Sequence, residues 1–255
     1  MQLHSESLNF YYLFYKVRKK LSETTAGFWS DLEIYSALNE GQQHIARKSK
    51  CLRKEVPVTT DGSQTYGLID NDFSDIIDID EDGVYFYVNG TSYQPLHYKT
   101  KSQLNKEFPG WQGVSASTPQ YFYYNKSTKT IGLYPKCNSS NQGEYLFING
   151  YYRPKILIAG TASSGSTTTL VMPAGTATLP YPNPTNDYYN DLYVEIYSGT
   201  GAGQKLKITD YVGLTRTLTF ATATAPDNTS VFGFVPEVPE EAHNLICVQK
   251  SAIMI

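Results

Sequence analysis

The strongest constraint on the fold of this chain is a change in its hydrophobic periodicity near Val56. Before this point, apolar residues recur at three- to four-residue spacing over residues 28–52, the spacing of one helix face. After it, apolar and polar residues alternate with period two, as in half-buried strands. The chain therefore has to combine helices near its N-terminus with a long β region.

Local signals place three helices outside the β region. Ser30 and Glu33 have the spacing of a capping box, at the start of the helix expected over residues 28–52. Residues 7–21 form a second candidate helix, whose aromatic end needs a partner to bury it. After Pro239 the helical pattern returns, which predicts a helix at the end of the sequence.

The β region divides into short strands separated by turn residues. We expect strands at 66–69, 76–79, 84–88, 121–125, 130–135 and 144–153, and a short helix at 101–108. Asp82-Gly83 predicts a tight hairpin turn between the second and third of these strands. Beyond Pro154 the composition shifts to Gly, Ala, Ser and Thr, and further strands are expected at 192–198, 205–211, 217–221 and 231–235. Regular short strands of this kind predict a small β sandwich or barrel.

Aromatic residues are unusually common, with 22 Tyr, 11 Phe and 2 Trp, whereas only 18% of residues are charged. Tyrosine combines a large apolar ring with a hydroxyl, which suits strand surfaces and subunit interfaces. The net charge is −3, and its sign alternates along the chain. No segment is basic enough to predict nucleic-acid binding. The composition indicates a mostly β protein that contacts other proteins.

Several classes of protein are excluded by simple counts. No apolar run approaches the roughly 18 residues that span a bilayer. The N-terminus lacks a basic segment ahead of its apolar cluster, so we expect no export signal. The three widely spaced cysteines, Cys51, Cys137 and Cys247, argue against a disulfide framework and against a zinc site, and favour folding in a reducing compartment.

Three short motifs resemble binding loops but lack the residues that their chemistry needs. Residues 78–83 open like a calcium loop, yet the twelfth position is Asn89 and not Glu. Residues 160–167 have P-loop spacing, but Ser166 stands where a lysine neutralises phosphate. Residues 199–204 lack the third glycine of a dinucleotide fingerprint. We therefore expect no catalytic residues, no metal and no cofactor, and conclude that the chain is not an enzyme.

Several longer motifs follow one another in a defined order. They occupy residues 29–43, 66–76, 108–111, 119–124, 131–135, 151–154 and 238–246. This order resembles that of the head-to-tail adaptor (connector) proteins of tailed bacteriophages, over residues 28–155 and 236–255. Two features depart from the family: Ile69-Asp70 stands where Leu-Pro is common, and the segment 156–235 is absent from the smallest adaptors.

The resemblance implies an α+β fold: a helical adaptor core with antiparallel β strands and an inserted small β-sandwich or barrel module. We expect the core at residues 1–155 and the inserted module at 156–235. A C-terminal helix at 236–255 would return to the core.

The resemblance also implies a function. The chain would be a structural virion protein that forms a ring, commonly of twelve copies, beneath the portal, where it extends the DNA channel and docks the tail. Its partners would be the portal protein, tail or nozzle proteins, other copies of itself, and genomic DNA that passes without specific binding, with no membrane. It would be made in the host cytoplasm and sit at the neck of the virion, between head and tail. The alternative is a tail- or fibre-associated module that recognises glycan through residues 156–235.

Two groups of residues are candidates for this role. A DNA conduit must not grip phosphate, so an acidic group is expected to face the channel: Asp70, Asp72, Asp75, Asp78, Asp80 and Asp82. Family members often dock on the portal with their C-terminal end, which here is the apolar tail Ile253, Met254 and Ile255.

Overall fold

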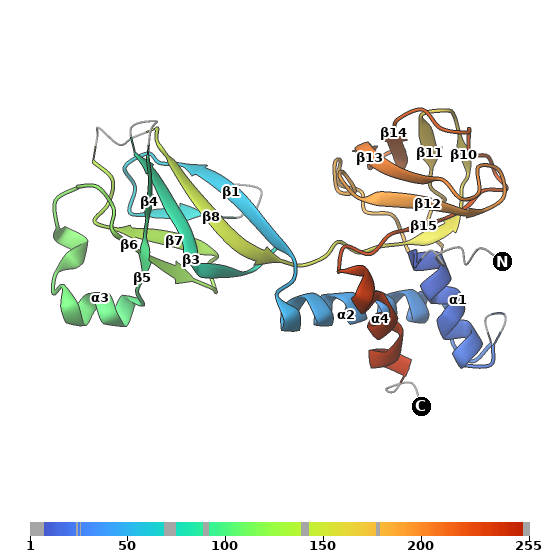
Figure 1. Cartoon of the computed structure of the whole chain (residues 1–255), viewed down its shortest axis with the longest axis horizontal. Coiled ribbons are helices and arrows are strands. Elements are labelled where there is room, and N and C mark those ends of the chain that lie inside the picture. Colours follow the sequence, from blue (N-terminus) through green and yellow to red (C-terminus); the bar gives the residue numbers. More distant parts are fainter. Residues whose placement is uncertain are drawn as a thin grey trace. The chain divides into compact units, whose positions relative to one another are not determined.

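The computed structural model describes residues 8–23, 25, 27–68, 75–88, 92–138, 143–176 and 179–251. The chain forms two compact units (Figure 1). One unit comprises residues 1–49 together with 154–255, and the other comprises residues 50–153. The boundaries expected from the composition lie at 155 and 235. In the structure, the middle of the chain interrupts a unit built from its two ends.

The described helices are α1 (Phe10–Lys20), α2 (Asp31–Ser49), α3 (Lys101–Glu107) and α4 (Glu240–Ser251), with a 3₁₀ turn at Trp111–Gly113. The strands of the middle unit are β1 (Arg53–Thr59), β2 (Thr65–Gly67), β3 (Ile76–Val88), β4 (Ser92–Pro95), β5 (His97–Tyr98), β6 (Tyr121–Asn125), β7 (Thr130–Tyr134) and β8 (Tyr145–Tyr152). Those of the other unit are β9 (Ala159–Thr161), β10 (Ser164–Gly165), β11 (Thr169–Val171), β12 (Tyr193–Ser198), β13 (Lys205–Val212), β14 (Thr217–Phe220) and β15 (Val231–Phe234).

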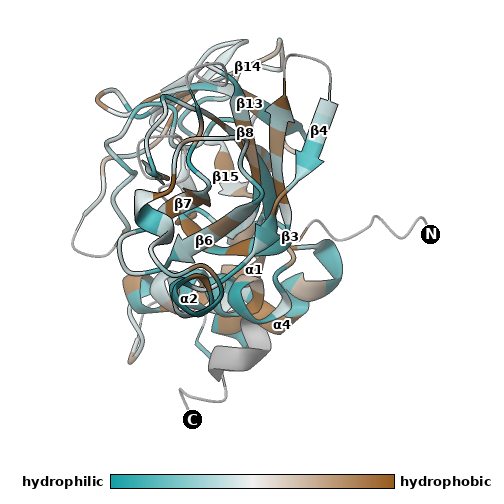
Figure 2. Cartoon of the chain, turned by 90° about the vertical axis from the view of Figure 1, so that its left-hand side faces the viewer, coloured by the Kyte–Doolittle hydropathy of each residue, from teal (hydrophilic) through white to brown (hydrophobic). Residues whose placement is uncertain are grey.

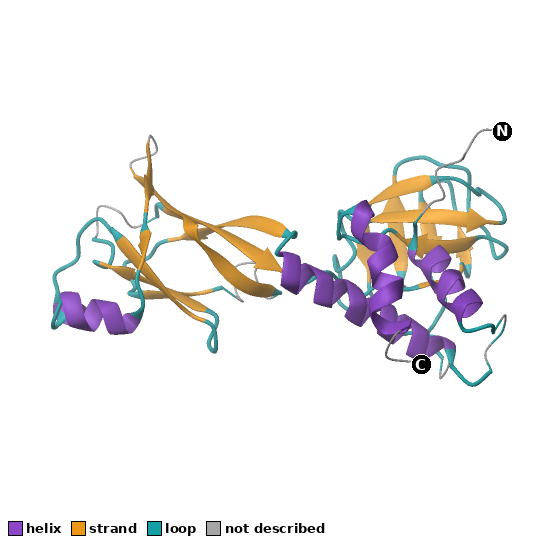
Figure 3. Cartoon of the chain, turned by 60° about the horizontal axis from the view of Figure 1, so that its bottom comes forward, coloured by secondary structure: helices purple, strands orange, loops and turns teal. Residues whose placement is uncertain are grey.

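The protein is mainly β, so the predicted α+β class with a helical adaptor core is wrong. Among the described residues, the strands of three sheets hold more of the chain than the four α-helices do (Figure 3). The error came from the resemblance, since the strand spacing and the composition by themselves indicate a mostly β protein.

Two four-stranded sheets make up the unit of residues 50–153, in the orders β1-β8-β3-β4 and β2-β7-β6-β5. Alternate residues of both sheets enter one shared core, so hydrophobic and hydrophilic residues occur along the same strands (Figure 2). The first sheet contributes Val56, Val58, Val84, Phe86, Leu146 and Ile148, and the second contributes Phe122, Ile131 and Leu133. Burying each of these side chains contributes about 1.5–3 kcal/mol.

The hairpin turn predicted at Asp82-Gly83 is wrong. Strand β3 continues through this position, and both of its halves pair with the same strand, β8. The register shifts between Ile79 and Val84, so the residues between them form a bulge. The carbonyl of Gly83 accepts a hydrogen bond from Nδ2 of Asn149 on β8, at 3.1 Å. The bulge keeps the apolar residues on both sides of it directed into the same core.

The other unit contains one seven-stranded sheet, in the order β10-β11-β14-β13-β12-β15-β9. Its two edge strands, β9 and β10, are joined by residues 162–163 alone, so the sheet must curl until its edges meet. Aromatic rings fill its interior. Tyr189 stacks on Phe234 with ring centroids 4.6 Å apart and meets the edge of Tyr211 at 4.8 Å.

Helix α1 lies against β15 and β9 and contacts both α2 and α4. Its first turn is capped by Asn9, whose Oδ1 accepts the backbone N–H of Tyr12 at 2.9 Å. Gly233 of β15 lies directly beneath this turn. A Cβ at Gly233 would lie 2.7 Å from the backbone N of Tyr11 and 2.9 Å from Oδ1 of Asn9. The glycine therefore allows the close approach of helix to sheet.

We predict that Gly233→Ala destabilises this unit by about 1–3 kcal/mol, since the added Cβ must displace the start of α1. Urea unfolding measures the change. Gly160→Ala is the matched control, because Gly160 lies on the neighbouring strand opposite Phe232 and a Cβ there meets only an ordinary contact at 3.6 Å. Equal unfolding midpoints for the two variants would contradict the prediction.

Candidate interaction surface

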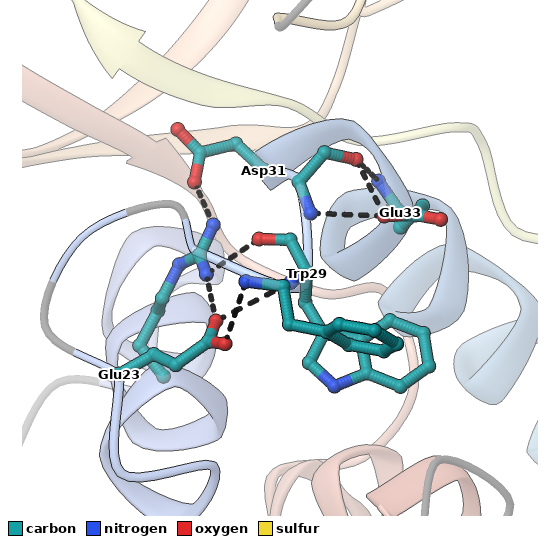
Figure 4. A network of polar contacts seen from close by, with 7 residues as sticks. Glu23, Trp29, Asp31 and Glu33 are labelled. Carbon is teal, nitrogen blue, oxygen red and sulfur yellow. Dashed lines mark hydrogen bonds and ion pairs between the residues drawn. The ribbon is translucent and has the colours of Figure 1, made fainter.

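A buried arginine organises the connection between α1 and α2. Arg18 is only 2% exposed. Its Nη1 donates to Oε2 of Glu23 at 2.8 Å and to the carbonyl of Trp29 at 2.7 Å, and its Nη2 pairs with Oδ1 of Asp31 (Figure 4). The guanidinium also lies over the ring of Phe14, 5.4 Å from its centroid. A buried cation needs such a set of partners, because leaving it unpaired costs several kcal/mol.

The carboxylate of Glu23, which pairs with Arg18, also accepts hydrogen bonds from the backbone of the loop between α1 and α2. It accepts the backbone N–H of Phe28 at 2.9 Å and that of Trp29 at 3.4 Å. The backbone of Phe28 and Trp29 is thereby hydrogen-bonded to both members of the Arg18–Glu23 ion pair. Charge-assisted hydrogen bonds of this kind are roughly twice as strong as neutral ones.

The capping box predicted at the start of α2 is confirmed. The backbone N–H of Ser30 donates to Oε2 of Glu33 at 2.9 Å, and the N–H of Glu33 donates back to the hydroxyl of Ser30 at 3.3 Å. These bonds to Ser30 hold the pKa of Glu33 below its usual value. The loop between α1 and α2 is therefore fixed at both of its ends.

The end of this loop presents the ring of Phe28 to solvent, beside the half-buried ring of Trp29. Phe28 is 84% exposed, and its ring meets the neighbouring ring of Trp29 edge-to-face, with centroids 5.2 Å apart. Hydrogen bonds to Glu23 hold the backbone that carries these two rings, which lowers the conformational entropy that the segment loses on binding. Aromatic residues are also enriched at protein interfaces. We therefore identify Phe28 and Trp29 as a candidate interaction surface, which we call the aromatic loop.

Sequence reasoning missed this surface. Nothing in the local spacing marks Arg18 as buried. The two acidic partners are five and thirteen positions away. Phe28 begins the helix expected over residues 28–52 and Trp29 opens the first motif of the adaptor resemblance, but neither pattern indicates an exposed aromatic ring.

The acidic candidates are partly paired inside the unit of residues 50–153. Asp78 accepts Nζ of Lys126 at 3.0 Å and of Lys50 at 3.4 Å, and Asp80 pairs with Nη2 of Arg53 at 2.6 Å. The negative charges of Asp78 and Asp80 are therefore paired with lysine and arginine side chains of the same unit.

Of the other acidic candidates, Asp82 is exposed and Asp75 is half-buried, while Asp70 and Asp72 lie outside the described residues. The channel-facing role of this group stays a prediction. The tail Ile253, Met254 and Ile255 also lies outside the described residues, so its docking role stays a prediction too.

Across the described part of the chain, no three His, Cys, Asp or Glu side chains are grouped so that they could hold a metal ion. No described helix has both the length and the apolar character to cross a membrane. Cys51 and Cys137 are free thiols. Burial raises the pKa of the Cys137 thiol, which keeps it protonated and unreactive.

We predict that Arg18→Met lowers the free energy of unfolding by about 2–4 kcal/mol, because it leaves two carboxylates and one carbonyl without their shared donor. Denaturant unfolding tests the effect. Lys48→Met, at an exposed position of α2, is the control and should change stability by less than about 0.5 kcal/mol. A loss for Arg18→Met no larger than that for Lys48→Met would show that the network does not hold the loop.

Comparison with known protein families identifies a relationship. The family model described as SU10 adaptor protein matches residues 13–175, which include most of α1, all of α2, the whole middle unit and the strands β9 to β11. No curated protein matches the chain. The matched region covers more than half of the sequence and confirms the resemblance to head-to-tail adaptors. The chain belongs to the SU10 adaptor protein family of bacteriophage structural adaptors.

Proposed function

We propose that this protein forms a ring beneath the portal of its phage, where it extends the DNA channel and docks the tail. The observation that carries the proposal is the family match over residues 13–175, because it includes segments of both compact units. The expected partners are the portal protein, tail or nozzle proteins and other copies of the chain, commonly twelve in all. The protein would be made in the host cytoplasm and reside at the neck of the virion.

The surface chemistry supports this assembly role. A ring closes when each copy contacts the next through two different surfaces related by the same rotation. The aromatic loop offers one rigid, uncharged contact surface for such an assembly. The chain as a whole has a net charge of −3, which suits a conduit through which DNA must pass without being held.

The first test mixes the purified chain with the portal ring from the same genome and weighs the product by native mass spectrometry. We expect the portal to gain one copy of the chain per portal subunit. If the portal gains nothing, and the chain alone forms trimers or binds glycan, the protein is instead a fibre-associated module and the adaptor proposal fails.

The same experiment tests the C-terminal tail. We expect removal of residues 253–255 to abolish portal binding while circular dichroism shows the chain still folded. Removal of residues 1–3 is a control of equal length and should leave binding intact. Full copy number with the tail removed would show that Ile253, Met254 and Ile255 are not the portal contact.

A further inference from the structure

The sheet β1-β8-β3-β4 has two very different faces. One face enters the core of its unit. An antiparallel sheet with one buried face normally directs polar or charged residues outward from the other. Here the outward-facing residues at the end of the strands where β3 connects to β4 form two rows that run across the sheet. The first row is Pro95, Tyr85, Phe147 and Pro57, and the second consists of the cross-strand pairs Tyr87–Tyr93 and Tyr145–Thr59.

Four of these rings, Tyr87, Tyr93, Tyr145 and Phe147, contact one another, and two of them are exposed to solvent. Tyr93 lies 4.8 Å from Tyr87 and 5.5 Å from Phe147 between ring centroids, and Tyr145 lies 6.1 Å from Phe147. Tyr93 is 62% exposed and Tyr145 is 45% exposed. None of the eight residues in the two rows carries a charge. We call this group the aromatic face.

We propose that the aromatic face is a contact between neighbouring copies of this chain. The inference rests on the proposed ring and identifies one of the surfaces through which it would assemble.

Charge favours a second copy as the occupant. Copies of one chain share a net charge of −3 and repel one another, so their contacts favour surfaces that bury no unpaired charge. Two charged side chains of β1 next to the aromatic face have partners within the chain, one a hydrogen bond and the other an ion pair. Glu55 accepts Nδ2 of Asn149 at 3.2 Å, and Arg53 binds Asp80 at 2.6 Å. DNA, in contrast, would require unpaired cations.

The dimensions of the aromatic face and the prolines of the edge strands favour a partner that packs on the face of the sheet. The two rows span about 14 Å across four strands and are separated by about 7 Å along them. A stable interface buries about 800 Å² on each partner, so the aromatic face would form the centre of a larger contact. The edge strands β1 and β4 carry Pro57 and Pro95, which lack the N–H that strand addition would use. The neighbouring copy is therefore expected to pack on the face and not to extend the sheet.

The test places a photoactivatable phenylalanine at Tyr93 in the full chain bound to its portal. We expect cross-linked peptides that join two copies of this chain. Cross-links to the portal alone would overturn the inference and leave the adaptor proposal standing. If the unmodified chain neither binds the portal nor forms a ring, the adaptor proposal itself has failed.

Substitution gives a second readout. Tyr93→Glu combined with Tyr145→Glu should weaken association between copies by at least about tenfold, measured by sedimentation of the ring at several concentrations. Tyr93→Phe should assemble normally. Tyr181→Glu, at a tyrosine that is 71% exposed outside the face, is the matched control and should also assemble normally. Circular dichroism verifies that each variant is folded, and unchanged assembly of a folded double variant would overturn the inference.

Discussion

The larger unit depends on a pair of hydrogen bonds between segments far apart in sequence. Nδ2 of Asn39 donates to the carbonyl of Leu157 at 2.9 Å, and the N–H of Leu157 donates to Oδ1 of Asn39 at 2.8 Å. Gln42, one turn later, donates to the carbonyl of Lys155 at 2.8 Å. These bonds join the two ends of an insertion of about a hundred residues. Closing so long a loop costs little more entropy than closing a short one, provided that the insertion folds by itself.

Asn39 and Gln42 belong to helix α2, which makes different contacts along its length. Its start is held by Asp31, which pairs with the buried Arg18, and its middle by the amides of Asn39 and Gln42. Gly41 lets α4 approach, since a Cβ there would lie 3.0 Å from the carbonyl of Ile246. Helix α2 therefore joins three sequence-distant parts of one unit. The aromatic loop directly precedes this helix, and its backbone is hydrogen-bonded to Arg18 and Glu23.

Local chemistry predicted the elements better than their arrangement. The Ser30–Glu33 capping box, the helix at 101–107 and the hairpin of β6 and β7 depend on residues close in sequence, and all are present. The turn at Asp82-Gly83 failed because both halves of β3 pair with β8, more than sixty residues away. The buried state of Arg18 and the outward direction of the aromatic face also depend on distant partners. Neither is encoded in local spacing.

The tyrosine content indicated a β protein with contact surfaces. Strand geometry decides which aromatic side chains fill the core and which face outward. On β3, the side chain of Phe86 enters the core, while its neighbours Tyr85 and Tyr87 belong to the outward rows. In the other unit, Phe234 of β15 and Tyr189, which precedes β12, stack on each other inside the curled sheet. Whether an aromatic residue stabilises the fold or stays available for a partner is decided by the alternation of the strand that carries it. In this member of a family of structural adaptors, this alternation is the feature that we propose links sequence to assembly.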